Sequence, residues 1–452
     1  MPACPSDTRT CDRFIADHSA AHSGPTLIVV GGLHANEPAG IEAAQRLHAA
    51  LTSRRITLSR GRFIALRGNL AALADEATSP WQRRRYIDED LNRVFRTTSP
   101  DSAAESSEQT ERAELSLTIQ HAVREATGPV FLLDLHTVSS DSPAFVALED
   151  SLPARRFAMC FPLPKVLGME EVLDGLLADH ATSEHGCIAC IAEAGRHDDP
   201  RAVDVHESLI LLALQAIGMS DRSFQTEAGE HPREVASAAA AGRSRHFYDL
   251  RQRVPIRHPS FRMNPGALAF TPVIAERTVV ASERHTPLVA EHTGSLFLPN
   301  RQTEPRVGDD AFFIVTRVGR LWLSLSALLR RNEHIHKALP RLLPGVRTRP
   351  GSPHTLIIAP EYAAVLRREI LHLLGYRLIR WEPAPHLSPI KRFLKAIAGI
   401  TASVASIITN AFRGAERAAL PHERPSDWIA RRRRLDIDPS IDGNTDRTPA
   451  TR

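Results

Sequence analysis

The chain has 452 residues, of which 42% are hydrophobic and 24% charged, an ordinary globular composition with room for two or three domains. This composition excludes a collagen-like, coiled-coil or wholly disordered chain. The formal net charge is only +4, from 56 Lys and Arg against 52 Asp and Glu, and the basic residues are scattered without interleaved aromatic residues. We therefore expect no nucleic-acid partner.

The first expected element follows a polar N-terminal tail, residues 1–23. The apolar run 25–30 predicts a strand buried on both faces, and after Gly31-Gly32 the residues 38–51 have helical character. Further expected strands are 62–66, 130–135 and 188–192, and further expected helices are 110–126 and 205–217. The alternation predicts an α/β domain over residues 24–220, in which ligands bind where strands end.

The pattern changes after this domain. Residues 221–245 are expected to be a linker, and residues 246–320 a small β domain of short strands. An α/β segment, 321–384, and a helical extension with a partly disordered tail, 385–452, are expected to follow. Within the extension, residues 396–412 carry no charge, but they contain polar side chains and fall short of the ~20 apolar residues of a membrane span. We expect no transmembrane segment there, and a packed or surface-lying helix instead.

The five cysteines are too few and odd in number for a disulfide framework, which favours a reducing compartment. No secretory pattern follows Met1, so the cytoplasm is the expected location. Cys187 and Cys190 have the spacing of half a zinc site, but no second pair completes it, and both are interpreted as packing residues.

Three polar motifs each lie at the end of an expected strand. His34 and Glu37 are three residues apart after the first strand, His136 follows Asp134 after another, and Glu193 follows a third. Singly, each has an ordinary explanation, such as a helix-capping Glu or a solvated strand end. Together, two imidazoles and a carboxylate that leave one position open are typical of catalytic zinc. A free carboxylate beside them is suited to act as a general base.

A fourth motif is unusually dense in charge and runs Arg85-Tyr-Ile-Asp-Glu-Asp-Leu-Asn-Arg93. Arg85 and Arg93 are candidates for stabilising an oxyanion and for gripping a substrate carboxylate. The alternative is an exposed, salt-bridged helix face.

In order and approximate spacing, the four motifs resemble the succinylglutamate desuccinylase/aspartoacylase family, relatives of the zinc carboxypeptidases. The segment 261–313 is similar to the β domain of that family, so the resemblance covers about residues 24–320. It implies an α/β fold with a zinc-carboxypeptidase-like mixed sheet flanked by helices, followed by a small β domain and a C-terminal helical extension.

The resemblance also implies a zinc-dependent hydrolase that cleaves the amide of a small N-acyl amino acid and holds one Zn²⁺ per chain. His34, Glu37 and His136 would bind the zinc ion. The remaining implied roles are polarisation of the scissile carbonyl by Arg85, substrate-carboxylate binding by Asn92 and Arg93, and general-base catalysis by Glu193.

One position departs from the family pattern. Aspartoacylase-like members carry a further substrate-binding Arg shortly before the catalytic Glu, where this chain has Ser183. Whether Arg196 replaces it stays open, as do the acyl group, the amine and a homo-oligomeric state. The alternatives are a carboxypeptidase-like or ester-cleaving activity, and a catalytically silent small-molecule-binding protein of the same fold.

Overall fold

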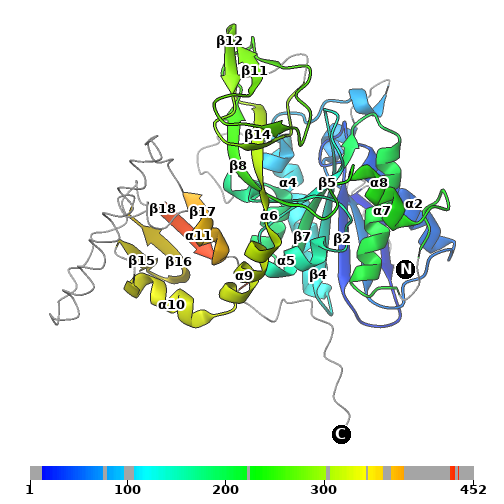
Figure 1. Cartoon of the computed structure of the whole chain (residues 1–452). Coiled ribbons are helices and arrows are strands. Elements are labelled where there is room, and N and C mark those ends of the chain that lie inside the picture. The colour runs from blue at the N-terminus through cyan, green and yellow to red at the C-terminus, as the bar shows by residue number, and fades with distance from the viewer. Residues whose placement is uncertain are drawn as a thin grey trace. The chain divides into compact units, whose positions relative to one another are not determined.

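The computed structural model describes residues 13–74, 79–95, 106–220, 224–301, 306–342, 345–359, 368–380, 428–432 and 436. These residues fall into two compact units (Figure 1), the first ending at Val318 and the second running from Gly319 to Pro439. The segment 396–412 lies outside the described residues.

The first unit is built on a mixed sheet of eleven strands, in the order β1-β3-β2-β4-β7-β5-β6-β8-β14-β13-β10. Its strands are β1 (Phe14–Ser19), β2 (Thr26–Gly31), β3 (Arg62–Arg67), β4 (Val130–Val138), β5 (Phe145–Leu148), β6 (Lys165–Leu167), β7 (Ile188–Arg196), β8 (Phe247–Pro255), β10 (Pro272–Val273), β13 (Gly294–Phe297) and β14 (Asp310–Val318). The expected mixed α/β sheet is therefore confirmed.

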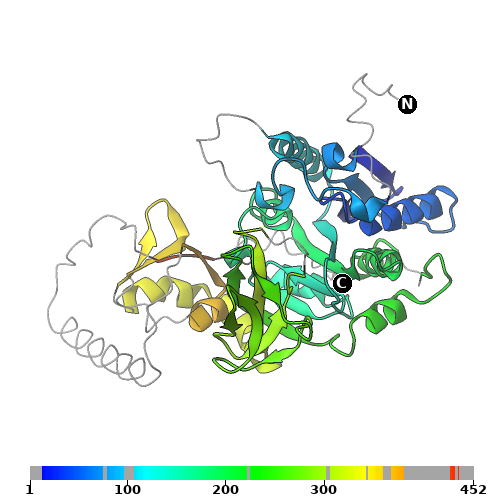
Figure 2. The same cartoon turned by 90° about the horizontal axis from the view of Figure 1, so that it is seen from above.

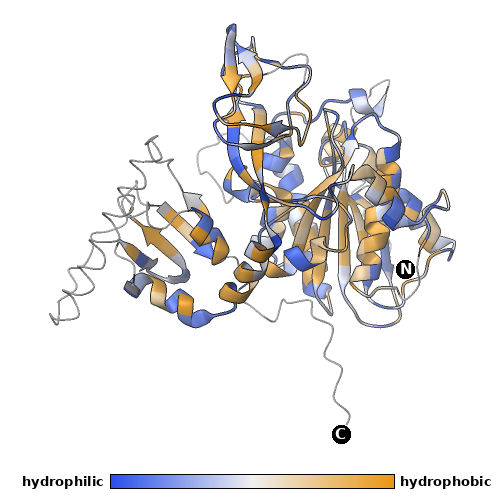
Figure 3. Ribbon diagram, viewed as in Figure 1, coloured by the Kyte–Doolittle hydropathy of each residue, from blue (hydrophilic) through white to orange (hydrophobic). Residues whose placement is uncertain are grey.

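The centre of this sheet is parallel. Strand β2 pairs in parallel with β3 on one side and β4 on the other, and β4 pairs in parallel with β7. Every residue of β2 is buried, as a continuous apolar run between two neighbours requires, and these central strands are among the most hydrophobic ribbons in Figure 3. The carboxyl ends of β2, β4 and β7 consequently meet at one edge.

Helices cover both faces of the sheet. They are α2 (Ala39–Thr52), α3 (Leu70–Leu73), α4 (Ser107–Glu125), α5 (Leu152–Ala158), α6 (Leu177–Ser183), α7 (Arg201–Ala216) and α8 (Pro232–Ala239), with single 3₁₀ turns η1 (Pro80–Gln82), η2 (Leu91–Arg93) and η3 (Met169–Glu171). Helices α2 and α7 pack side by side (Figure 2). Leu115 and Ile119 of α4 join a buried cluster with Ile28 of β2 and Leu132 of β4.

The expected catalytic and small β domains share the large sheet, since β8 pairs in parallel with β6 and continues through β14, β13 and β10. A separate three-stranded sheet is formed by β9 (Arg262–Met263), β11 (Val279–Glu283) and β12 (Thr286–Val289). The expected linker contains α8, whose Val235 and Ala236 are buried. Strands before and after the predicted linker therefore belong to one sheet, although the composition of the sequence changes between them.

The second unit has a sheet of four antiparallel strands in the order β15-β16-β18-β17. Its elements are α9 (Arg320–Arg330), α10 (Glu333–Leu342), β15 (Val346–Arg349), β16 (Ser352–Ile358), α11 (Arg368–Leu373), β17 (Tyr376–Arg380) and β18 (Trp428–Arg432). The expectation of only helix and disordered tail over 385–452 is wrong at β18, which lies between two other strands. Arg432, which falls within the expected tail, is buried and pairs with Glu333 at 2.5 Å.

No helix in the described part of the chain is long and apolar enough to cross a membrane.

Candidate metal centre

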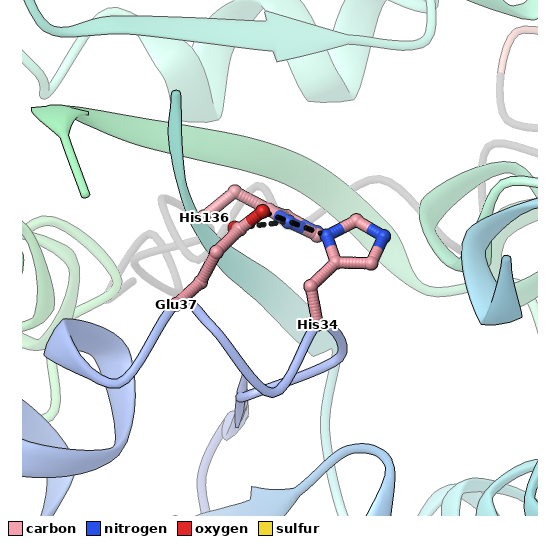
Figure 4. A group of neighbouring side chains, drawn as sticks. All are labelled: His34, Glu37 and His136. Atoms are coloured by element: carbon pink, nitrogen blue, oxygen red, sulfur yellow. Dashed lines mark hydrogen bonds and ion pairs between the residues drawn. The ribbon is translucent and has the colours of Figure 1, made fainter. Parts of the chain in front are cut away.

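Three predicted metal ligands converge where β2 and β4 end (Figure 4). His34 and Glu37 lie in the turn between β2 and α2, and His136 lies near the end of β4. Because β2 and β4 are parallel neighbours with Gly31 opposite Leu135, residues separated by about a hundred positions meet at one edge of the sheet.

Two glycines allow the turn that carries His34 and Glu37 to sit close to the sheet. A Cβ on Gly31 would lie 2.7 Å from the backbone of Gly40, and a Cβ on Gly40 would lie 2.7 Å from Cβ of Leu135. Real Cβ atoms do not approach so closely, so glycine at both positions lets the start of α2 rest on β2 and β4.

The carboxylate of Glu37 bridges the two imidazoles. Its Oε1 lies 2.9 Å from Nδ1 of His34, and its Oε2 lies 3.0 Å from Nδ1 of His136. One ligand atom from each residue lies within 4.8 Å of the others, and all three side chains are buried. The backbone N–H of Thr137 donates to Oε2 of Glu37 at 2.9 Å, which fixes the carboxylate plane.

The outward nitrogen of each imidazole faces a second carboxylate. Nε2 of His34 lies 3.0 Å from Oδ1 of Asp90, and Nε2 of His136 lies 3.0 Å from Oδ2 of Asp134. Metal-binding histidines commonly hold their second nitrogen against a carboxylate in this way, which leaves the first nitrogen as a lone-pair donor. The sequence places Asp134 two residues before His136 and assigns no role to Asp90.

Burial and charge act against each other on these groups. Burial favours a neutral Glu37, but His34 and His136 outweigh it and hold the pKa of Glu37 well below its usual range. Burial likewise opposes a charged His136, yet Asp134 and Glu37 raise its pKa well above the ordinary value. The carboxylates of the centre therefore favour positive charge beside them, and this is the electrostatic setting in which a cation binds.

Arg85 adjoins the same centre. Its Nη1 donates to Oε1 of Glu37 at 2.9 Å, and its Nε and Nη2 both donate to Oδ2 of Asp90 at 3.2 Å. Burial would lower the pKa of Arg85, but Asp90, Glu37 and Glu193 together raise it, so the guanidinium stays charged. Asp90 thus holds both Arg85 and His34.

Asn92 and Arg93 lie in η2. Oδ1 of Asn92 accepts the backbone N–H of Leu177 at 2.8 Å, so the amide is oriented with Nδ2 3.4 Å from Nε2 of His136. Arg93 donates through Nη1 to the carbonyl of Asn92 at 2.8 Å, and its Nη2 lies 3.6 Å from Oδ2 of Asp310 on β14. Asn92 therefore has a structural bond that the sequence did not indicate.

Glu193 lies inside β7, directly opposite His136 in the parallel register. Its Oε2 is buried without a hydrogen-bond partner among the described residues. Burial is the main cause that raises the pKa of Glu193 to about 8, with Glu37 and Asp134 adding to it against His136 and Arg85. Gly195, at φ +103°, lies two residues later, next to the last residue of the strand.

All seven predicted site residues line one cavity of about 880 Å³. His197, to which the sequence assigns no role, also lines it, and its Nδ1 lies 2.8 Å from Oγ1 of Thr137. Arg196 does not line this cavity; it is exposed and pairs with Asp141 and Asp198.

The β strands after residue 246 supply one wall of the cavity. The charged residues of that wall are Arg253, Arg306, Asp309 and Asp310. Arg253 donates to Oδ1 of Asp310 at 2.5 Å, and Arg306 donates to the hydroxyl of Tyr86 at 3.4 Å. The sequence indicated neither arginine, because it does not show which residues of the β domain face the predicted site residues.

Comparison with known proteins gives the following matches. Residues 23–197 match the family model described as "Succinylglutamate desuccinylase/Aspartoacylase catalytic domain". No curated protein sequence matches the chain.

Solved structures that resemble the chain include a succinylglutamate desuccinylase from Vibrio parahaemolyticus, with 16% identity, a TM-score of 0.46, and coverage of 67% of this chain and 84% of that one. A succinylglutamate desuccinylase/aspartoacylase from Rhodobacter sphaeroides has 19% identity and a TM-score of 0.46, over 66% of this chain and 87% of that one. The product-bound ectoine utilization protein EutE (DoeB) from Ruegeria pomeroyi has 17% identity and a TM-score of 0.48, over the same shares.

The match over residues 23–197 spans all four motifs, from His34 to Glu193. Residues 23–197 of the chain therefore match the catalytic-domain model of the succinylglutamate desuccinylase/aspartoacylase family.

Proposed function

We propose that the protein is a zinc-dependent hydrolase that cleaves the linear amide of an N-acyl amino acid or a similar small acylated amine. The observation that carries this proposal is the convergence of His34, Glu37 and His136 beside the buried carboxylate of Glu193.

The donor set fits one Zn²⁺ per chain. Two imidazole nitrogens and one carboxylate oxygen are the ligands of catalytic zinc sites, which keep a further position open. The pairing of Nε2 of His34 with Asp90, and of Nε2 of His136 with Asp134, leaves both Nδ1 atoms directed at the shared centre. A bound Zn²⁺ would supply Lewis acidity, which acidifies a water molecule and polarises a carbonyl oxygen.

Glu193 is the proposed general base. Its carboxylate is buried in the cavity wall and its Oε2 has no partner in the described structure, so it is available to accept a proton from the attacking water and return it to the leaving nitrogen. Burial raises the pKa of Glu193 to about 8, and the charge of a bound Zn²⁺ would oppose that shift and favour the carboxylate form that accepts the first proton.

Arg85 is proposed to donate hydrogen bonds to the substrate oxygen as negative charge develops on it. Its guanidinium lies beside Glu37 and stays charged. Asn92, through Nδ2, and Arg93, through its guanidinium, are proposed to hold the substrate carboxylate from η2, because both line the same cavity.

The cavity volume of about 880 Å³ suits a small ligand. Its β-strand wall favours a short acyl amino acid over a long peptide. Arg253 on that wall is paired with Asp310, whereas Arg306 donates to the uncharged hydroxyl of Tyr86. Arg306 is therefore the proposed partner of an acyl group that carries its own carboxylate, which is the preferred substrate class despite Ser183 near the position of the family Arg.

The cytoplasm is the proposed location. It is supported by the lack of a disulfide bond among the three cysteines in the described part of the chain, Cys160, Cys187 and Cys190, which suits a reducing compartment.

The experiment is product analysis with the purified full chain, after its metal content has been measured. The panel contains acetyl and succinyl amino acids, the matching esters, and a dipeptide. We expect about one zinc per chain and release of the free amino acid from an acyl amino acid, with the dicarboxylic acyl group preferred.

Each alternative has its own outcome. Preferential release of the C-terminal residue from the dipeptide would indicate a carboxypeptidase-like activity, and faster turnover of the esters an esterase. A protein that binds acyl amino acids without zinc and without turnover would be the catalytically silent binding protein.

A further inference from the structure

Helix α9 of the second unit carries an apolar face that the described residues of the unit leave uncovered. Leu321 is 88% exposed, Leu328 69%, Leu325 43% and Trp322 38%. At ~3.6 residues per turn these four side chains fall within an arc of ~120°. The arc forms a continuous apolar strip along the helix, which we call the α9 strip.

The opposite side of α9 is fixed in the unit. Ser326 and Arg330 are buried there. Arg330 pairs with Asp436 at 3.1 Å and donates to the carbonyl of His372 at 2.6 Å. Helix α11 packs against α9 and adds Ile370, which is 40% exposed. The α9 strip is therefore presented by an anchored helix rather than by a frayed chain end.

The unit that carries the strip is strongly basic. The sequence from Gly319 to Pro439 contains 21 Lys and Arg against nine Asp and Glu, a formal charge of +12, whereas the rest of the chain has −8. Two of the basic side chains, Arg320 and Arg331, are exposed at the two ends of α9. Lys337 and Arg341 on the following helix are exposed as well.

We propose that the second unit binds the surface of an anionic membrane, with the α9 strip inserted at the level of the lipid headgroups and the basic side chains on the phosphates. Leucine and tryptophan on one side of a helix with arginine beside them is the arrangement of helices that lie in the plane of a bilayer. Charge alone would suit a nucleic acid, and exposed leucines alone would suit a second copy of the chain. The combination of both features in one unit favours the lipid surface.

The test uses the full zinc-loaded chain and sedimentation with vesicles of phosphatidylcholine, either pure or partly replaced by phosphatidylglycerol. We expect binding to the phosphatidylglycerol vesicles only, weakened by salt, because the lipid charge is screened. The double variant Leu321→Gln/Leu328→Gln should bind at least ~10-fold more weakly. Lipids brominated in their acyl chains should quench the fluorescence of the wild type more than that of Trp322→Phe.

The matched control is Leu117→Gln, which changes a 53% exposed leucine on α4 of the first unit and should leave vesicle binding unchanged. All these positions are exposed, so circular dichroism and hydrolysis of a soluble substrate should stay as in the wild type. A wild type that ignores the anionic vesicles would overturn the proposal. Undiminished vesicle binding by the double variant would also overturn it. So would a wild type that forms a dimer without lipid, if the double variant is a monomer under the same conditions.

Discussion

Glu37 joins the two halves of the candidate centre with one carboxylate, because each of its oxygens faces the Nδ1 of a different histidine. Neither Asp90 nor Asp134 touches this carboxylate in the described contacts; each acts on the far side of an imidazole. At this scale the centre is two histidines held between carboxylates, with Arg85 and Glu193 next to them.

Glu193→Gln is expected to keep zinc and to lose turnover by at least ~10². The amide has the shape of the carboxylate but cannot accept and return the proton. The measurement is kcat together with zinc content. Glu207→Gln is the matched control, because Glu207 is also buried but does not line the cavity. Turnover in Glu193→Gln close to that of the control would remove Glu193 from the mechanism.

Asp90→Asn is expected to weaken zinc binding by about 10- to 100-fold, because an amide orients the imidazole of His34 less strongly than a carboxylate does. Competition with a chelator measures the affinity. Asp88→Asn, two residues earlier, changes a carboxylate that bonds the backbone of Ser107 and should leave zinc affinity as it is. Equal zinc affinity in the two variants would contradict an orienting role for Asp90.

Lys165 gives the stability of the fold a pH dependence. It is buried at the start of β6, where it donates to the carbonyls of Phe161 and Ser244 at 2.7 and 2.9 Å, and burial lowers its pKa from 10.5 to about 8. Between about pH 8 and 10.5 the unfolded chain binds more protons than the folded one. The free energy of unfolding should therefore rise with pH through this window, by about 3 kcal/mol in all.

The measurement is denaturant unfolding of the wild type and Lys165→Met across pH 7 to 10.5. Subtracting the free energy of unfolding of Lys165→Met from that of the wild type removes the contribution of the cysteines, which titrate in both proteins, and leaves that of Lys165. A difference that does not change with pH would show that the folded chain carries Lys165 with an ordinary pKa.

The sequence does not show which side chains from distant segments contact one another, and this limited the predictions for single residues. Residue type and strand position were enough to select His34, Glu37, His136 and Glu193. The role of Asp90 was not predicted, because 56 positions separate Asp90 from His34. No pattern in either segment indicates that these two side chains face each other.

The turn between β2 and α2 positions the centre at the scale of elements. It works because Gly31 and Gly40 let helix and strand approach, so His34 and Glu37 reach the end of β4. A change in helix packing there should act on stability and on metal binding together.

Gly40→Ala tests this packing. In an ordinary helix interior the change would stabilise by ~1 kcal/mol, but here the new Cβ would lie 2.7 Å from that of Leu135. We expect the free energy of unfolding to fall by about 1 to 2 kcal/mol through overpacking, with weaker zinc binding. Gly266→Ala, where the Cβ meets nothing within 4 Å, is the control. A stabilised Gly40→Ala protein would refute the close-approach argument.

The strands that carry the centre were predicted from apolar runs, and the predicted strands end before the observed ones. Strands β4 and β7 continue through His136 and Glu193, because polar residues still pair in the sheet when a neighbour is present. Strand β18 was missed, since Trp428–Arg432 pairs with β16 and β17 from a basic segment. Periodicity reports which face is buried but not which strands are neighbours.

At the scale of the molecule, the sequence change near residue 221 does not end the large sheet. The strands that follow extend it and form one wall of the cavity, with Arg253 and Arg306. The family resemblance predicted a β domain in that region. Only the structure shows that arginines of this domain line the cavity. The second unit has its own core and its own charge.

One divalent ion is expected to bind among His34, Glu37 and His136. Diffraction from crystals of the full chain at the zinc absorption edge would locate it. We predict one anomalous peak per chain, between the two Nδ1 atoms and the Glu37 carboxylate. A map with no peak there from zinc-containing crystals, or with the zinc bound elsewhere, would contradict it.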